Sequence, residues 1–183
     1  MATEHHIAQL NLTLPAVPAD SPEFTDDDFV ESFDKITRKA QFTDGYVWRL
    51  FGGSADGRRV LDAVWPDDPR IVVNLSVWET FDSLREFVYR GAHADFMRRR
   101  AKALTVPFSE AYQVLWWIPA WTAPTVAEAR ERLLHLREHG PSPYAFTFTR
   151  TFPPEALADQ AVQTQALQDQ ALQDHAEPGI SGR

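Results

Sequence analysis

Two polar side chains, Asn74 and Ser76, interrupt an otherwise apolar run in the sequence IVVNLSVW, residues 71–78. Amide and hydroxyl groups placed among apolar ones can orient a small molecule in a pocket by hydrogen bonding. His93 follows this run, and a positioned histidine can act as a general base near neutral pH or ligate a haem iron. The segment 71–100 therefore predicts a pocket, although hydrogen bonds across a dimer interface would explain Asn74 and Ser76 equally well.

The other candidates for this pocket are aromatic, amide and charged side chains. Tyr89 could donate a proton to a developing enolate, and Arg100 could bind an anion because it lies on the His93 side of its helix. Ordinary core packing would also explain the aromatic residues. The predicted set comprises the catalytic candidates His93, Asn74 and Tyr89, and the substrate-binding candidates Gln9, Asn11, Trp48, Ser76, Trp78, Phe96, Arg100 and Trp116.

Composition excludes several classes of function. The formal net charge of −8 gives no electrostatic support for binding nucleic acid, whose phosphates need a basic surface. The chain has no cysteine, so it has no disulfide, thiolate nucleophile or thiolate metal site. His135 and His139 have a spacing that metal ligands use, but their place at a helix C-terminus suits cationic side chains, and we expect no metal site. No apolar run approaches about 18 residues, and the N-terminus lacks the parts of a signal peptide, so we expect a cytoplasmic protein without membrane contact.

Periodicity predicts five strands and three helices. Alternation of apolar and polar residues predicts strands at His6–Leu14 and Tyr144–Phe152. Apolar and aromatic runs predict three more strands, at Tyr46–Phe51 after the Asp44-Gly45 turn signal, at Ile71–Trp78 and at Ala111–Ala120. Helical spacing and capping residues indicate helices at Pro22–Ala40, at Thr80–Leu104 with a break near Gly91, and from Thr125 to His139. Gly52–Arg70 is expected to form a long loop, and the Gln- and Ala-rich acidic segment 153–183 an appendage to a domain of residues 1–152.

The order of these elements predicts an α+β fold with an antiparallel sheet and helices on one face. Apolar residues such as Leu10 and Leu75 would lie under the helices. The opposite face would carry Gln9, Asn11, Asn74, Ser76 and Trp78. An antiparallel sheet can leave one face to water, but the aromatic surface favours cover by a second copy of the sheet. We therefore expect a homodimer that encloses a cavity.

Several segments together resemble a bacterial family of unknown function. They are HIAQLNL, GYVWRL, NLSVWETFDSLREFVYRGAHADFMRRR, LWWIPA, PTVAEARERL and HGPSPYAFTF, and the resemblance covers about His6–Thr149. That family looks like part of the antibiotic-biosynthesis-monooxygenase-like group of dimeric α/β barrels. The resemblance implies a ferredoxin-like protomer that pairs into a dimeric α/β barrel. It also implies that His93, in the context YRGAHADF, lies near the pocket, because a histidine after the strand–helix junction recurs there in the wider group.

The wider group contains cofactor-independent monooxygenases of polycyclic aromatics, haem-degrading and haem-dependent enzymes, polyketide cyclases and ligand binders, and fold alone does not choose among them. Our first hypothesis is an enzyme without a cofactor that acts on a hydrophobic aromatic or polyketide-like molecule. It would oxygenate, cyclise or isomerise that molecule after proton abstraction by His93. The second hypothesis is a non-catalytic binding or stress-response protein with the same cavity. The third is haem binding through His93.

Overall fold

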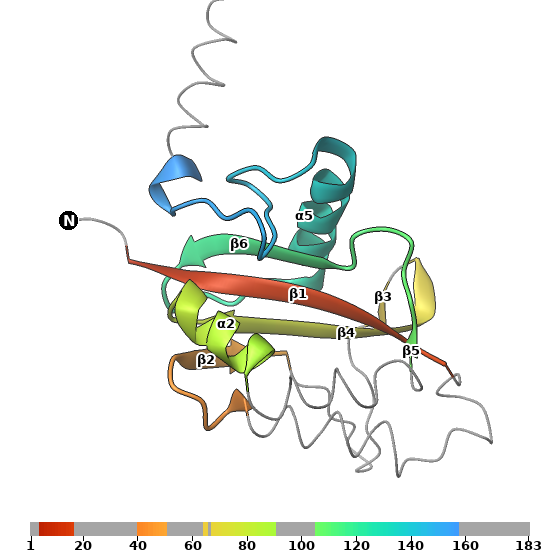
Figure 1. The fold of residues 1–183 in the computed structure, drawn as a ribbon, viewed down its shortest axis with the longest axis horizontal. Coiled ribbons are helices and arrows are strands. Elements are labelled where there is room, and N and C mark those ends of the chain that lie inside the picture. The colour runs from red at the N-terminus through yellow and green to blue at the C-terminus, as the bar shows by residue number, and fades with distance from the viewer. Residues whose placement is uncertain (1–3, 17–39, 51–63, 66, 91–104, 158–183) are drawn as a thin grey trace, which may run out of the picture.

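The computed structural model describes residues 4–16, 40–50, 64–65, 67–90 and 105–157. The elements within these ranges are arranged around one sheet (Figure 1). In chain order they are β1 (His5–Pro15), β2 (Tyr46–Arg49), β3 (Val64–Trp65), β4 (Asp68–Trp78), α2 (Phe81–Tyr89), β5 (Thr105–Val106), β6 (Gln113–Pro119) and α5 (Val126–His139).

β1 is the central strand, and its neighbours in the sheet run antiparallel to it. β4 pairs along one edge of β1, while β6 and β5 pair along the other edge. β2 and β3 both pair with β4. Because β1 and β2 are each antiparallel to β4, they run parallel to one another with β4 between them, which is the split arrangement of a ferredoxin-like fold. The expected α+β fold with an antiparallel sheet is confirmed.

One face of the sheet packs against α5. Successive residues of a strand point to opposite faces, and on this face Leu10 of β1, Leu75 of β4 and Trp116 of β6 are buried. They form one apolar cluster with Leu133 of α5. The apolar alternation in β1 and β4 therefore builds the core under α5.

The opposite face packs against α2. Ile7, Trp78 and Leu115 form a second apolar cluster with Leu84 of α2. α2 and α5 thus lie on opposite sides of the sheet (Figure 1). The prediction of helices on one face only is wrong, because Ile7, Trp78 and Leu115 make a second apolar face that also has to be kept from water.

The tryptophans on which the dimer expectation relied are covered within one chain. Trp78 is 1% exposed and Trp116 is fully buried. Trp117 is partly buried in the cluster under α2. The uncovered aromatic face that favoured a second copy of the sheet therefore does not exist at these positions, and the homodimer stays a prediction.

α2 begins at a capping box in which Thr80 and Ser83 exchange hydrogen bonds. The backbone N–H of Ser83 donates to the Thr80 hydroxyl at 3.1 Å, and the N–H of Thr80 donates to the Ser83 hydroxyl at 3.3 Å. The helix ends at Tyr89, since Arg90 is extended. This end agrees with the expected break near Gly91. The continuation of the predicted helix to Leu104 and the predicted helix Pro22–Ala40, except Ala40, lie outside the described residues.

α5 has the start and the end that its sequence predicts. The Thr125 side chain accepts a hydrogen bond from the backbone N–H of Glu128 at 3.1 Å, and Gly140 follows the last turn with a φ angle of 75°. The carboxylate of Glu128 accepts a hydrogen bond of 3.0 Å from the indole N–H of Trp116. Glu128 thus ties α5 to the sheet.

Two sequence predictions about loops and strands are corrected. Trp65, expected in a long loop, lies in β3 beside β4 and is 2% exposed in the core under α5. The expected strand Tyr144–Phe152 does not form, and within it only Phe146 pairs with the sheet, at Leu115 of β6. The N–H of Thr147 donates to the carbonyl of Arg150 at 3.3 Å, so the chain turns there instead of continuing along β6.

Gly45 and Gly140 provide a matched test of how tightly the start of α2 packs against the turn before β2. Both have a positive φ angle, but a Cβ at Gly45 would lie 2.6 Å from the Ser83 side chain, whereas one at Gly140 would meet open space. Gly140→Ala should therefore cost only backbone strain, about 1–3 kcal/mol. Gly45→Ala should cost at least about 1 kcal/mol more, because Ser83 has to shift. Urea denaturation measures both losses, and equal losses would contradict the contact.

Candidate functional site

The register of the strands arranges side chains of the α2-side face into three rows that cross the sheet. In an antiparallel pair, residues opposite one another point to the same face. The rows are Tyr46–Trp78–Ile7–Trp117 (the aromatic row), Arg49–Ser76–Gln9 (the inner polar row) and Asn74–Asn11–Gln113 (the outer polar row). Hydrogen-bonding side chains from β1, β2, β4 and β6 are therefore neighbours on a face that is apolar at the α2 end.

The inner polar row lies in the interior of the protein. Gln9 and Ser76 are only 5% and 6% exposed. The indole N–H of Trp78 donates to the Ser76 hydroxyl at 3.1 Å, and that hydroxyl donates to the Gln9 carbonyl oxygen at 3.5 Å. Buried polar groups cost free energy unless they are hydrogen-bonded, and this chain of hydrogen bonds reduces that cost.

The aromatic row forms the wall next to the inner polar row. Tyr46 contacts Trp78 edge-on at 5.5 Å between ring centroids, and Phe87 of α2 packs on Trp78 at 4.9 Å. Burial raises the pKa of the Tyr46 phenol, an effect that the positive charge of Arg49 partly opposes. At the other end of the row the Trp117 indole N–H donates to the Phe152 carbonyl at 2.7 Å. Trp78 is therefore covered by its neighbours, whereas Tyr46 and Trp117 on its two sides are only partly buried. These two rings could pack against a flat ligand, and the polar rows beside them could hold an oxygen-bearing group.

The structure brings together five of the residues predicted from the sequence. Gln9, Asn11, Asn74, Ser76 and Trp78 share the α2-side face, in adjacent rows. Their expected position away from the helices is wrong, because α2 packs at the Trp78 end of this face.

The structure does not bring the other candidates to this face. Trp48 and Trp116 pack in the cluster under α5, on the opposite side of the sheet. Tyr89 is 57% exposed and contacts Phe148, with 5.3 Å between the ring centroids. His93, Phe96 and Arg100 lie outside the described residues.

Five residues of the rows were absent from the predicted set: Ile7, Tyr46, Arg49, Gln113 and Trp117. In each case the signal was the strand period, which assigns alternate residues to alternate faces. Once Asn11 and Ser76 are placed on one face, the pairings Asn11–Gln113 and Ser76–Arg49 follow from the register. The sequence alone does not give that register, and the predicted set therefore named Trp48 and Trp116 in place of their neighbours Arg49 and Trp117.

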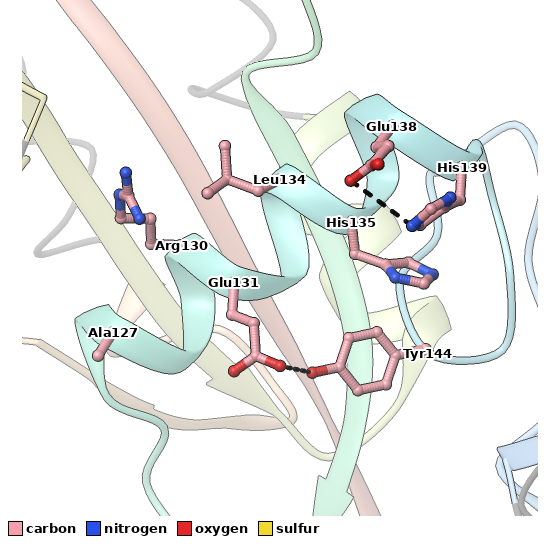
Figure 2. A pocket seen from close by; sticks show the side chains of 8 residues that line it. All are labelled: Ala127, Arg130, Glu131, Leu134, His135, Glu138, His139 and Tyr144. Carbon is pink, nitrogen blue, oxygen red and sulfur yellow. Dashed lines mark hydrogen bonds and ion pairs between the residues drawn. The ribbon is translucent and has the colours of Figure 1, made fainter.

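A second group of polar side chains surrounds a shallow depression of about 300 Å³ on the outer side of α5 (Figure 2). Figure 2 shows Tyr144 beside Glu131, and the Tyr144 hydroxyl donates to the Glu131 carboxylate at 2.5 Å. His135 and His139 project from successive turns of the helix, with 4.6 Å between their ring centroids. Among the residues that the structure describes, no group of three or more histidine, cysteine or acidic side chains is arranged to hold a metal ion.

The polar groups of this depression bond with residues of the protein itself. A ring nitrogen of His135 lies 3.2 Å from the Ser142 hydroxyl, and Arg130 forms a salt bridge of 2.7 Å with Asp67. These contacts fasten α5 to the segment after it and to the turn between β3 and β4. We therefore assign the depression a structural role and place the candidate site on the α2-side face.

His135 makes the attachment of α5 sensitive to pH. Burial, and then the nearby His139, lower the pKa of His135 below its ordinary value. The unfolded chain therefore binds more protons than the folded protein below a pH of about 6.5, so stability is complete above that pH and declines as the pH falls below it. The melting temperature should fall between pH 8 and pH 5, and fall less in His135→Gln, whose amide can still bond Ser142. Parallel pH profiles of the two proteins would contradict a contribution from His135.

One known protein family matches most of the chain. The family described as "Domain of unknown function (DUF3291)" matches residues 6–163. The chain belongs to this family. The match confirms the resemblance drawn from the sequence, and it extends past the domain boundary expected at residue 152. No curated protein matches the DUF3291 chain.

Several solved structures resemble the DUF3291 chain at low sequence identity. A proposed antibiotic biosynthesis monooxygenase from Nitrosomonas europaea is 10% identical, with a TM-score of 0.42 over 68% of this chain and 98% of the other. SnoaB, a cofactor-independent oxygenase from Streptomyces nogalater, is 13% identical, with a TM-score of 0.39 over 69% of this chain and 100% of the other. Protein SO0527 from Shewanella oneidensis is 10% identical, with a TM-score of 0.41 over 63% and 90%.

Helices long and apolar enough to cross a membrane are absent from the part of the DUF3291 chain that the structure describes.

Proposed function

We propose that this DUF3291 protein is an enzyme that binds a hydrophobic, ring-containing small molecule on the α2-side face of its sheet. The observation that supports this proposal is the pair of polar rows beside the aromatic row. Apolar walls with a few converging polar groups are the usual form of a small-molecule site. A ring would pack against the aromatic row, and an oxygen-bearing group would lie over the polar rows.

The proposed reaction starts with removal of a proton next to a carbonyl or phenol group of the bound molecule. The polar rows would stabilise the negative charge that develops on the oxygen, as preorganised hydrogen-bond donors do. The resulting carbanion would then react with dioxygen, or close or rearrange a ring. His93 is the proposed base, on the sequence argument, and Asn74 is the polar residue proposed to orient the substrate.

A ligand screen tests the proposed site. Bicyclic and tricyclic aromatic ketones and phenols should shift the NMR signals of the Trp78 indole and of the Gln9, Asn11 and Asn74 side-chain amides. Asn74→Leu removes one hydrogen-bonding group and should weaken binding roughly tenfold. Trp48→Phe, on the opposite face of the sheet, is the control and should leave affinity unchanged. Ligands that shift only signals of the α5 side would contradict the site.

Turnover separates an enzyme from a binding protein. With a ligand from the screen, the wild type should consume dioxygen or give a product of altered mass or ring structure. His93→Ala should abolish this turnover while changing the free energy of unfolding by no more than about 1–2 kcal/mol. Ligand binding without turnover in the wild type would indicate a non-catalytic binding protein with the same site. Full turnover in His93→Ala would exclude His93 as the base.

A further inference from the structure

Trp78, Ser76 and Gln9 form a chain of hydrogen bonds that has a direction. An indole N–H can only donate, so the Ser76 oxygen must accept from Trp78, at 3.1 Å. The Ser76 hydroxyl then gives its own proton to the Gln9 carbonyl oxygen, at 3.5 Å. This bond turns the Gln9 carbonyl oxygen towards Ser76, so the two N–H groups on the other side of the carboxamide point away from Ser76 and can donate to a ligand.

The inner polar row also contains Arg49, at the end away from Gln9. Arg49 lies opposite Ser76 in the register, so it belongs to the row that contains Gln9. A guanidinium group has donors and no acceptor. The inner polar row thus combines the N–H donors of Gln9 with the positive charge of Arg49.

We propose that the Trp78–Ser76–Gln9 chain makes the inner polar row selective for an acceptor oxygen, the carbonyl of a ring ketone or the oxyanion of its enolate. This inference rests on the proposed function, because it takes the α2-side face as the ligand site. Gln9 contacts the ligand oxygen, whereas Ser76 and Trp78 are positioning residues that fix the orientation of the Gln9 amide. A ligand group with no acceptor at this position leaves the buried Gln9 N–H groups without a partner, which is costly.

The chain of hydrogen bonds can be tested in the protein without ligand. Trp78→Phe removes the indole N–H and keeps an aromatic ring, so Ser76 can rotate and the Gln9 amide loses its fixed orientation. The NMR signals of the Gln9 side-chain N–H₂ group, assigned by their loss in Gln9→Met, should shift or broaden in Trp78→Phe. Trp116→Phe is the matched control, because its indole N–H donates to Glu128 on the opposite face. Gln9 signals that are the same in wild type and Trp78→Phe would overturn the inference.

The selectivity can be tested with two probes of the same shape. 1-Tetralone has a carbonyl oxygen, and 1-methylenetetralin has a CH₂ group in its place and no acceptor. The wild type and Trp116→Phe should bind the ketone roughly tenfold more tightly, the effect of one buried hydrogen bond. This preference should fall to less than about threefold in Gln9→Met and in Trp78→Phe.

The outcomes distinguish the inference from the proposed function. If the wild type binds both probes equally, with shifts at the Trp78 indole, the site stands and the selectivity is wrong. If Gln9→Met keeps the ketone preference, Gln9 is not the contacting donor and the inference is wrong. If neither probe binds, the selectivity for ring ketones is wrong, whereas the proposed site is decided by the wider screen of ketones and phenols.

Discussion

The pairing of β1 with β4 on one side and β6 on the other is the constraint on which the rest of the structure depends. It puts Gln9 beside Ser76, and Asn11 between Asn74 and Gln113. A slip of one residue would exchange the two faces of β1. Both faces are buried around Ile7 and Leu10, and each such side chain contributes roughly 1.5–3 kcal/mol when buried. Burial on both faces of the sheet therefore fixes the register. The register in turn fixes which side chains are neighbours in the polar rows.

The position of α2 is the reason for placing the candidate site at the polar rows and not on the α5 side. α2 covers the aromatic row, where Trp78 is almost completely buried, and its apolar cluster also includes Leu115, which stands opposite Gln9. Burial then decreases along the sheet, from Ser76 to the half-buried Asn74. Hydrogen bonds made next to the aromatic row are stronger than those in water because the local dielectric constant is low. On the α5 side, the polar groups Glu128 and Trp116 bond to one another and fasten the helix.

The sequence predicted the parts of the fold that have a local cause. Alternation predicted β1, apolar and aromatic runs predicted β4 and β6, and the capping box at Thr125 predicted the start of α5. It failed where the cause lies in distant residues. Trp65 belongs to the core because β4 offers an edge to pair with, and Tyr144–Phe152 alternates like a strand but turns at Thr147.

The sequence predicted the candidate site only in part. The polar residues of β1 and β4 were recognisable because they interrupt apolar strands. Their relation to Arg49 and Gln113 depends on pairing, which no single strand contains. The assignment of Trp48 and Trp116 to the site failed for the same reason: tryptophan fits either face of a sheet, and only its neighbours decide which.

Trp116 and Trp117 are adjacent in β6, and their indole N–H groups bind two different parts of the protein, α5 and the segment that follows α5. The Trp116 indole holds α5 through Glu128, and the Trp117 indole holds the segment after it through the Phe152 carbonyl. α5 and the segment after it are also bonded to one another, through Ser142 and His135. The two anchoring points on β6 are a single peptide bond apart, so a displacement of this part of β6 would reach α5 and the segment after it together.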